Sequence, residues 1–232
     1  MGLLGHRPWC ALATAVGAAA VLTSAPQVQA MQNGITGYSG KQGATCNDDC
    51  HTGGVTPLVR FDGPRRVMAD AVATFRFVVT SQSSKQKVAG FNVAVNDGVL
   101  GVLPNQGEHL EFDELTHDAA KPNVNGEAGW LFSWKAPGQP GVSRLYGAGL
   151  SANGNGTDGG DDSDVTVFTA TVTSEPIGDT NCDARLSAAD ATAVVELLPS
   201  GAPGACSGAD ADGSGVVDAS DVAVVVAALF GG

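Results

Sequence analysis

A short segment near the N-terminus places two thiols next to an imidazole. Cys46, Cys50 and His51 form the pattern C-x3-C-H within the glycine-rich stretch TGYSGKQGATCNDDCHTGG. Two thiols can bond the two vinyl groups of a porphyrin while the adjacent imidazole binds its iron, as in a c-type haem. The usual motif has two residues between the cysteines, so this chain carries one more. The segment from 31 to 54 is therefore a candidate site for one covalent haem.

The same residues allow two other chemistries. In an oxidising compartment a disulfide between Cys46 and Cys50 would fix the loop and leave His51 beside it. Zinc is a third interpretation, although only three ligands are local. A haem could also take a second axial ligand, and the sequence does not choose among three distant residues that could supply it, His117, His109 and Met68.

The C-terminal part repeats a spacing of oxygen-bearing side chains. The stretch DTNCDARLSAAD from Asp179 to Asp190 matches DADGSGVVDASD from Asp210 to Asp221. Each copy has such residues at loop positions 1, 3, 5, 9 and 12, and position 7 would offer a backbone carbonyl. Calcium is bound by six to eight oxygens in loops of this kind. The predicted ligands of two calcium ions are Asp179, Asn181, Asp183, Arg185, Ser187, Asp190, Asp210, Asp212, Ser214, Val216, Asp218 and Asp221.

Each of these loops is followed by an apolar run that predicts a short helix, over residues 191–198 and 222–230. The last aspartate of each loop would lie at the start of the helix, where negative charge is favoured. Cys182 lies inside the first loop and Cys206 lies just before the second. We expect a disulfide between them, which would stabilise the module by roughly 3 kcal/mol on a chain-entropy estimate.

Residues 55 to 174 show the pattern of β-structure. Four stretches rich in β-branched and aromatic residues, 72–81, 89–97, 129–137 and 164–173, are separated by turn signals such as Asn-Asp-Gly and Asn-Gly. This spacing predicts an antiparallel β-sandwich. Within it we expect Trp130 and Trp134 on one face of the sheet and Phe132 on the other.

No catalytic constellation stands out in the predicted sandwich. A cluster of four carboxylates lies close to His109 and His117 in the sequence: Glu108, Glu111, Asp113 and Glu114. A hydrolase could use two such carboxylates as acid and nucleophile, but we favour a solvated strand edge or loop for this cluster. No nucleophile-elbow motif is present. The chain is therefore predicted to be non-enzymatic.

Composition and the N-terminus indicate an exported protein. The chain has 24 acidic and 12 basic residues and a formal charge of −12, which argues against a nucleic-acid partner. His6, Arg7, the apolar run from 10 to 22 and the small residues before Ala30 predict a signal peptide cleaved after Ala30. The later run 222–230 is too short to span a membrane. We expect a secreted, periplasmic or cell-surface protein without a transmembrane span after cleavage.

These observations divide the chain into four parts. They are a signal peptide over 1–30, the Cys-Cys-His segment over 31–54, a β-sandwich over 55–174 and a calcium-binding module over 175–232, with Glu175 and Pro176 as linker. The predicted fold is mainly β, with an antiparallel β-sandwich followed by a small α-helical module of paired calcium loops.

The C-terminal repeat resembles a type I dockerin over residues 178–230. The G-D-x-N-x-D motif from Gly178 to Asp183 and the order of loop and helix carry this resemblance. It implies a calcium-binding module that docks onto a cohesin-like partner, and thereby a component of polysaccharide degradation. The first loop departs from the pattern, with Ala184 where the second loop has a turn glycine, Gly215. Dockerins recognise their partner largely through loop positions 10 and 11, here Ala188, Ala189, Ala219 and Ser220.

Residues 34 to 173 resemble the reeler-like extracellular domain of bacterial choice-of-anchor proteins. The matching pieces are the Cys-Cys-His segment, Thr116-His117, WLFSWKAPG around Trp134 and YGAGLSANGNGTDGGDD from Tyr146. The resemblance implies a sandwich of immunoglobulin-like or reeler-like kind and, because that family commonly carries C-x-x-C-H here, a haem. Three functions follow as alternatives: a calcium-binding protein for extracellular binding or assembly, a haem electron carrier, and a component that acts on extracellular polysaccharide.

Overall fold

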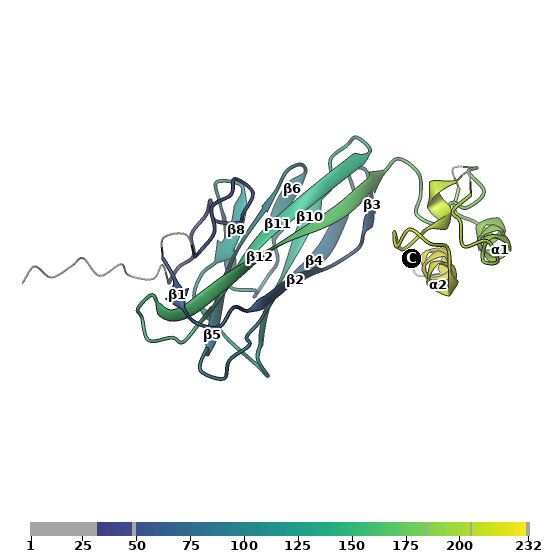
Figure 1. Ribbon diagram of the computed structural model, residues 1–232. Helices are drawn as coiled ribbons and strands as arrows, with labels where there is room; N and C mark the ends of the chain where they lie inside the picture. The colour runs from purple at the N-terminus through teal and green to yellow at the C-terminus, as the bar shows by residue number, and fades with distance from the viewer. Residues whose placement is uncertain (1–31, 48–49, 184, 205, 231–232) are drawn as a thin grey trace, which may run out of the picture.

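The computed structural model describes residues 32–47, 50–183, 185–204 and 206–230. The predicted signal peptide over 1–30 lies outside the described residues, as does Ala184. The described chain forms two β-sheets and a small helical module that follows the last strand (Figure 1).

Two sheets make up the larger part of the molecule. The first has the strand order β1-β12-β11-β5-β8-β7, with β3 paired to β12 and β9 paired to β5. The second has the order β2-β4-β10-β6. The strands are β1 (Thr52–Gly53), β2 (Leu58–Asp62), β3 (Arg66–Met68), β4 (Val72–Thr80), β5 (Val88–Val95), β6 (Val99–Val102), β7 (Glu108–Glu111), β8 (Glu114–His117), β9 (Lys121–Pro122), β10 (Glu127–Lys135), β11 (Gly141–Ala152) and β12 (Gly159–Thr173).

The two sheets pack face to face around an aromatic core. Trp130, Phe132 and Trp134 of β10 are all fully buried in this core. The expectation that Phe132 takes the other face was wrong, because residues two apart in a strand point to the same side. Phe91 and Leu115 reach the same core from the other sheet. The prediction of a mainly β, sandwich-like fold is therefore confirmed.

Most strand pairs are antiparallel, as predicted, but two are not. β1 and β3 both pair with β12 in parallel. A parallel pair needs a long connection, and here most of the sandwich lies between the partners. These short parallel strands hold the N-terminal segment and the start of the sandwich against β12.

The helical module contains α1 (Ala188–Leu197), the short 3-10 helix η1 (Ser207–Ala209) and α2 (Ala219–Phe230). Both α-helices begin three residues before the predicted position. In α1 the reason is a capping box, in which Ser187 and Asp190 satisfy each other's backbone N–H groups. None of the described helices is long and apolar enough to cross a membrane.

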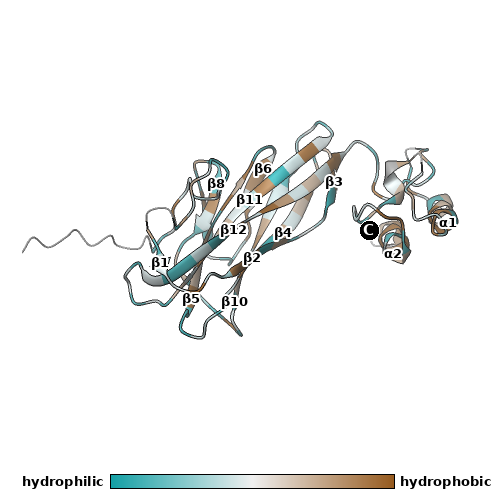
Figure 2. Cartoon of the chain, in the orientation of Figure 1, coloured by the Kyte–Doolittle hydropathy of each residue, from teal (hydrophilic) through white to brown (hydrophobic). Residues whose placement is uncertain are grey.

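A disulfide joins Cys182 and Cys206, as predicted from their positions. The two helices carry many hydrophobic residues (Figure 2), but the core between them is small. It consists, in the described part of the module, of Val194, Ala209, Ala211, Val217 and Val225.

Candidate functional site

The segment from 32 to 47 lies over the outer face of the eight-stranded sheet. The backbone N–H of Tyr38 donates to Oδ1 of Asn92 at 2.9 Å, and that of Ile35 donates to Oγ1 of Thr116 at 3.1 Å. Asn92 and Thr116 point away from the core, because their neighbours along the strands, Phe91 and Leu115, point into it. The sheet therefore has a second, outer layer, and the space between the two is the candidate site.

The Cys-Cys-His motif is fastened to β12. Oδ1 of Asn47 accepts the N–H of Ser163, and its Nδ2 donates to the carbonyl of the same residue, both at 3.0 Å. On the other side of the motif, Thr52 pairs with Gly159. These contacts place the motif at one end of the sheet.

Both cysteines and two histidines line one cavity under this segment. It has about 510 Å³ of space not filled by atoms, part of it open to solvent, and its lining includes Cys46, Cys50, His51 and His117. A second cavity of about 680 Å³ shares His51, His117 and two more residues with it. Further residues that line the first cavity include the apolar or aromatic Ile35, Tyr38 and Leu150.

His51 is held by a buried carboxylate. The residue is 7% exposed, and Nδ1 lies 3.2 Å from Oδ2 of Asp161, which is itself 2% exposed. The other oxygen of Asp161 accepts the N–H of Asn153 at 2.8 Å. We assign Nδ1–H as the donor to Asp161, so Nε2 of His51 carries the lone pair. Metal-binding histidines are usually held in this way.

His117 is 8% exposed and turns Nδ1 toward the backbone of Phe91. Nδ1 lies 3.1 Å from the N–H and 3.3 Å from the carbonyl of that residue. Burial lowers the pKa of His117, which outweighs the opposite effect of the contact with Phe91. The ring is therefore neutral at pH 7, the form in which imidazole binds metals.

The other two residues considered as axial ligands are not in the cavities. His109 is half-buried, and its Nδ1 lies 2.8 Å from Oδ1 of Asp118. Met68 belongs to β3 and is 38% exposed. Neither lines the cavities that hold His51. The structure places both Cys46 and Cys50 as half-buried thiols and does not join them in a disulfide.

The carboxylate cluster near the histidines does not converge on one point. Glu108 is buried, and burial raises its pKa to about 7 although Leu103 donates a backbone hydrogen bond to it. Oε2 of Glu114 accepts the N–H of Gly37 at 2.8 Å and so helps to fasten the N-terminal segment. Glu111 and Asp113 are exposed. Glu111 and Asp113 thus fit the solvated edge or loop that we expected, whereas the buried Glu108 and Glu114 do not.

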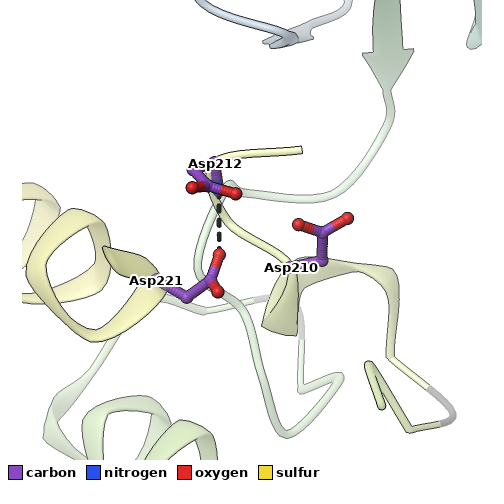
Figure 3. Close-up of side chains that lie close together, drawn as sticks. All are labelled: Asp210, Asp212 and Asp221. Atoms are coloured by element: carbon purple, nitrogen blue, oxygen red, sulfur yellow. Dashed lines mark hydrogen bonds between the residues drawn. The ribbon is translucent and has the colours of Figure 1, made fainter. Parts of the chain in front are cut away.

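In the C-terminal module, the second loop brings three carboxylates together. Asp210, Asp212 and Asp221 each have an oxygen within 4.8 Å of the others (Figure 3). Asp221 is fully buried, and its two oxygens accept the N–H groups of Asp212 at 3.0 Å and Asp218 at 2.8 Å. Oδ1 of Asp210 is buried without a hydrogen-bond partner among the described residues. Three close carboxylates repel one another unless a cation lies between them.

The first loop has the same design with fewer converging charges. Asp190 is fully buried and accepts backbone N–H groups from Thr180, Asn181 and Ser187. Burial would raise the pKa of Asp190, but these hydrogen bonds hold it below its usual value. Asp179 is also fully buried. The other predicted ligands line the rims of the two loops and are half-buried or exposed: Asn181, Asp183, Arg185, Ser187, Ser214, Val216 and Asp218.

The partners of the two histidines were missed in the sequence. Asp161 lies in an acidic, glycine-rich stretch, and Gly90 and Phe91 lie in a predicted strand. Nothing in their local pattern links them to His51 or His117. Only the strand register brings them together.

Comparison with known proteins adds little. No family model and no curated protein matches the chain. Among solved structures, the CARDB domain of the PF1109 protein from Pyrococcus furiosus, in complex with di-metal ions, is 15% identical with a TM-score of 0.31, covering 53% of this chain and 94% of that one. A DUF4466 family protein from Parabacteroides merdae is 8% identical with a TM-score of 0.32, covering 52% of this chain and 46% of that one. Scores this low carry no argument about either part of the molecule.

Proposed function

We propose that the sandwich holds one covalent c-type haem and transfers electrons, and that the C-terminal module binds calcium. The observation that carries the first part is the cavity that Cys46, Cys50 and His51 line together. A bound haem would supply a reversible one-electron couple. The protein's residues would attach it, orient it and exclude water from it.

The arrangement of the ligands supports a ring-shaped cofactor over a single zinc ion. Zinc ligands lie 2.0–2.3 Å from the metal, so their atoms are about 4 Å apart. Among the described residues, no three of Cys46, Cys50, His51 and His117 bring their ligand atoms within 4.8 Å of one another. Two thiols and an imidazole that line one cavity suit a macrocycle that is bonded at its edge and ligated at its centre.

Each residue of the motif then has a defined task. Cys46 and Cys50 would each add an S–H across one vinyl C=C bond, which gives two thioethers without loss of atoms. His51 would present Nε2, with its ring fixed by Asp161. The apolar residues Ile35 and Leu150 would keep the macrocycle dry.

We also propose that the protein works outside the cytoplasm. The disulfide between Cys182 and Cys206 is of the kind that persists in oxidising compartments. The predicted signal peptide supports the same location.

The experiment for the haem is direct. The full chain is produced in a host that attaches c-type haem, and its intact mass and pyridine haemochrome spectrum are measured. One haem per chain is expected, with complete loss in a Cys46→Ser, Cys50→Ser variant and retention in a Cys182→Ser, Cys206→Ser control. The proposal would be rejected if the intact mass of the wild type showed bound zinc, a Cys46–Cys50 disulfide or the unmodified chain in place of a haem.

Calcium binding is a second proposal, favoured by the second loop. Asp210, Asp212 and Asp221 converge, and one oxygen of Asp210 is buried without a partner among the described residues. Two calcium ions, one in each loop, would neutralise these charges. Isothermal titration of the full chain should give two sites, and Asp210→Asn with Asp212→Asn should remove one. A titration without heat in the wild type would rule out both sites.

A partner for the module is proposed on the dockerin resemblance. The residues at loop positions 10 and 11 are all exposed at the helix starts, so a cohesin-like protein could reach them: Ala188, Ala189, Ala219 and Ser220. Such docking would place the chain among extracellular components that act on polysaccharide. A binding assay against a panel of cohesins, with and without calcium, tests this, and a uniformly negative panel would leave the module as a calcium-stabilised structural unit.

A further inference from the structure

Two histidines from distant parts of the chain face the same space. His51 follows the second cysteine, while His117 is the last residue of β8. Both line both cavities, together with Gly90 and Leu150. A haem ligated by His51 in this space therefore has His117 as a neighbour on the sheet side.

His117 is oriented for ligation. Its Nδ1 lies 3.1 Å from the backbone nitrogen and 3.3 Å from the carbonyl oxygen of Phe91, so it accepts from the N–H in one tautomer and donates to the carbonyl in the other. Ligation uses the second tautomer, in which Nε2 carries the lone pair. No hydrogen bond to Nε2 of either histidine is found in the described part of the chain. His51 has the same arrangement, with Asp161 in place of the carbonyl. The two rings are therefore anchored through Nδ1 and keep Nε2 for a ligand.

Gly90 makes room for the ring of His117. A Cβ atom at position 90 would lie 2.5 Å from Cε1 and 2.9 Å from Nε2 of His117. Distances this short force one of the groups to move. No positive φ requires a glycine here, so close approach of the imidazole is the physical reason for it. A side chain at this position would push Nε2 away from its present place.

We propose that His117 is the second axial ligand, so that the iron of the bound haem has six ligands, two of them imidazoles. This assignment rests on the haem proposed above and selects one residue from the three that the sequence left open. His109 and Met68 lie outside the cavities, so they would have to displace structure to reach the iron. With both axial positions filled by the protein, the centre suits electron transfer and has no open position for a small molecule.

The test uses the full chain carrying covalent haem. The wild type is expected to show a low-spin, six-coordinate spectrum and to bind no carbon monoxide in the ferrous state. His117→Ala should keep the haem by mass but become high-spin and bind carbon monoxide, and added imidazole should restore the low-spin spectrum. His117→Met should raise the midpoint potential, because a thioether ligand favours the reduced iron. His109→Ala is the matched control and should behave as the wild type.

A second pair of variants tests the position of the His117 ring without replacing either histidine. Gly90→Ala should cause partial loss of the low-spin signal. Gly101→Ala is its control, because the added Cβ also meets a side-chain atom at 2.5 Å, the hydroxyl of Ser133, but away from the cavity. Its spectrum should not change.

The outcomes separate the two proposals. A haem-bearing His117→Ala variant that stays low-spin overturns the role of His117 and leaves the haem in place. A wild type without haem overturns both. The far-ultraviolet circular dichroism of each variant shows whether the sandwich has folded.

Discussion

The sandwich and the C-terminal module differ in what they bury. The sandwich core contains seven aromatic residues among its eighteen buried hydrophobic side chains in the described chain. The module buries five hydrophobic residues there, all valine or alanine, next to fully buried carboxylates such as Asp190 and Asp221. A large core can tolerate a cavity beneath an added segment, whereas a core this small needs a metal ion or a covalent bond.

The two candidate sites also differ in how the chain assembles them. The two proposed calcium loops are contiguous stretches of twelve residues, so the candidate ligands are close in the chain before the module folds. The cavity needs the Cys-Cys-His segment, β5, β8 and β12 together. We therefore expect the module to depend on its ion and the cavity to depend on the sheet, and the following measurements test this contrast.

Calcium removal should have the largest effect. Chelation should abolish the helical far-ultraviolet signal of α1 and α2, because an ion at about a thousandfold its dissociation constant contributes roughly 4 kcal/mol. The module contains no tryptophan, so the fluorescence of Trp130 and Trp134 reports the sandwich alone and should not change. A joint loss of both signals would mean that the two parts fold as one unit.

Loss of the disulfide should come next. Cys182→Ser with Cys206→Ser should lower the stability of the module by about 3 kcal/mol, because the bond closes a loop with a sequence separation of 24. Thermal unfolding followed by circular dichroism, with calcium present, measures this. An unchanged midpoint for the helices would show that calcium alone holds the module.

Glu108 should make the stability of the sandwich depend on pH. Burial raises its pKa from 4.5 to about 7 in the folded protein. The stability that the protonated group contributes is present below pH 4.5 and is lost as the pH rises to about 7. Glu108→Gln should therefore be more stable than the wild type at pH 8, by on the order of 1–3 kcal/mol, and equal to it at pH 4. Urea unfolding at both pH values is the measurement, and equal gains at both would assign the effect to packing.

Asp161→Asn should have the smallest effect. It removes the negative charge beside Nδ1 of His51, which weakens the imidazole as an electron donor to iron. The midpoint potential of the haem-bearing protein should rise by on the order of 50 mV, the equivalent of about 1 kcal/mol. Asp164→Asn, three residues further along β12, is the control, because its carboxylate accepts only the adjacent N–H of Val165 among the described residues. An equal shift there would indicate a general charge effect.

The sequence predicted local features well and long-range ones poorly. Four of the five longest strands were found because 72–81 and the similar stretches carry aromatic and β-branched residues between turn signals. The fifth, β11, was missed, since its many glycine, alanine and serine residues give no such pattern. Short strands such as β1, β3 and β9 were also missed, since two or three residues carry no periodic pattern. The disulfide was predicted because both cysteines flank a repeat. His117 could be named only as one of three ligands, because its approach to His51 depends on the register of β5 with β8 and on β1 with β12.

β12 has a consequence for mechanical load. It carries Asp161 near its first end, leads to the C-terminal module from its last residue, Thr173, and pairs with β11 over eleven positions. A pull on the module would run along this strand and strain its hydrogen bonds to β11 together, in shear, instead of opening them one after another. If the module is held by a partner, the sandwich can bear tension while Asp161, near the unloaded end, keeps its place beside His51.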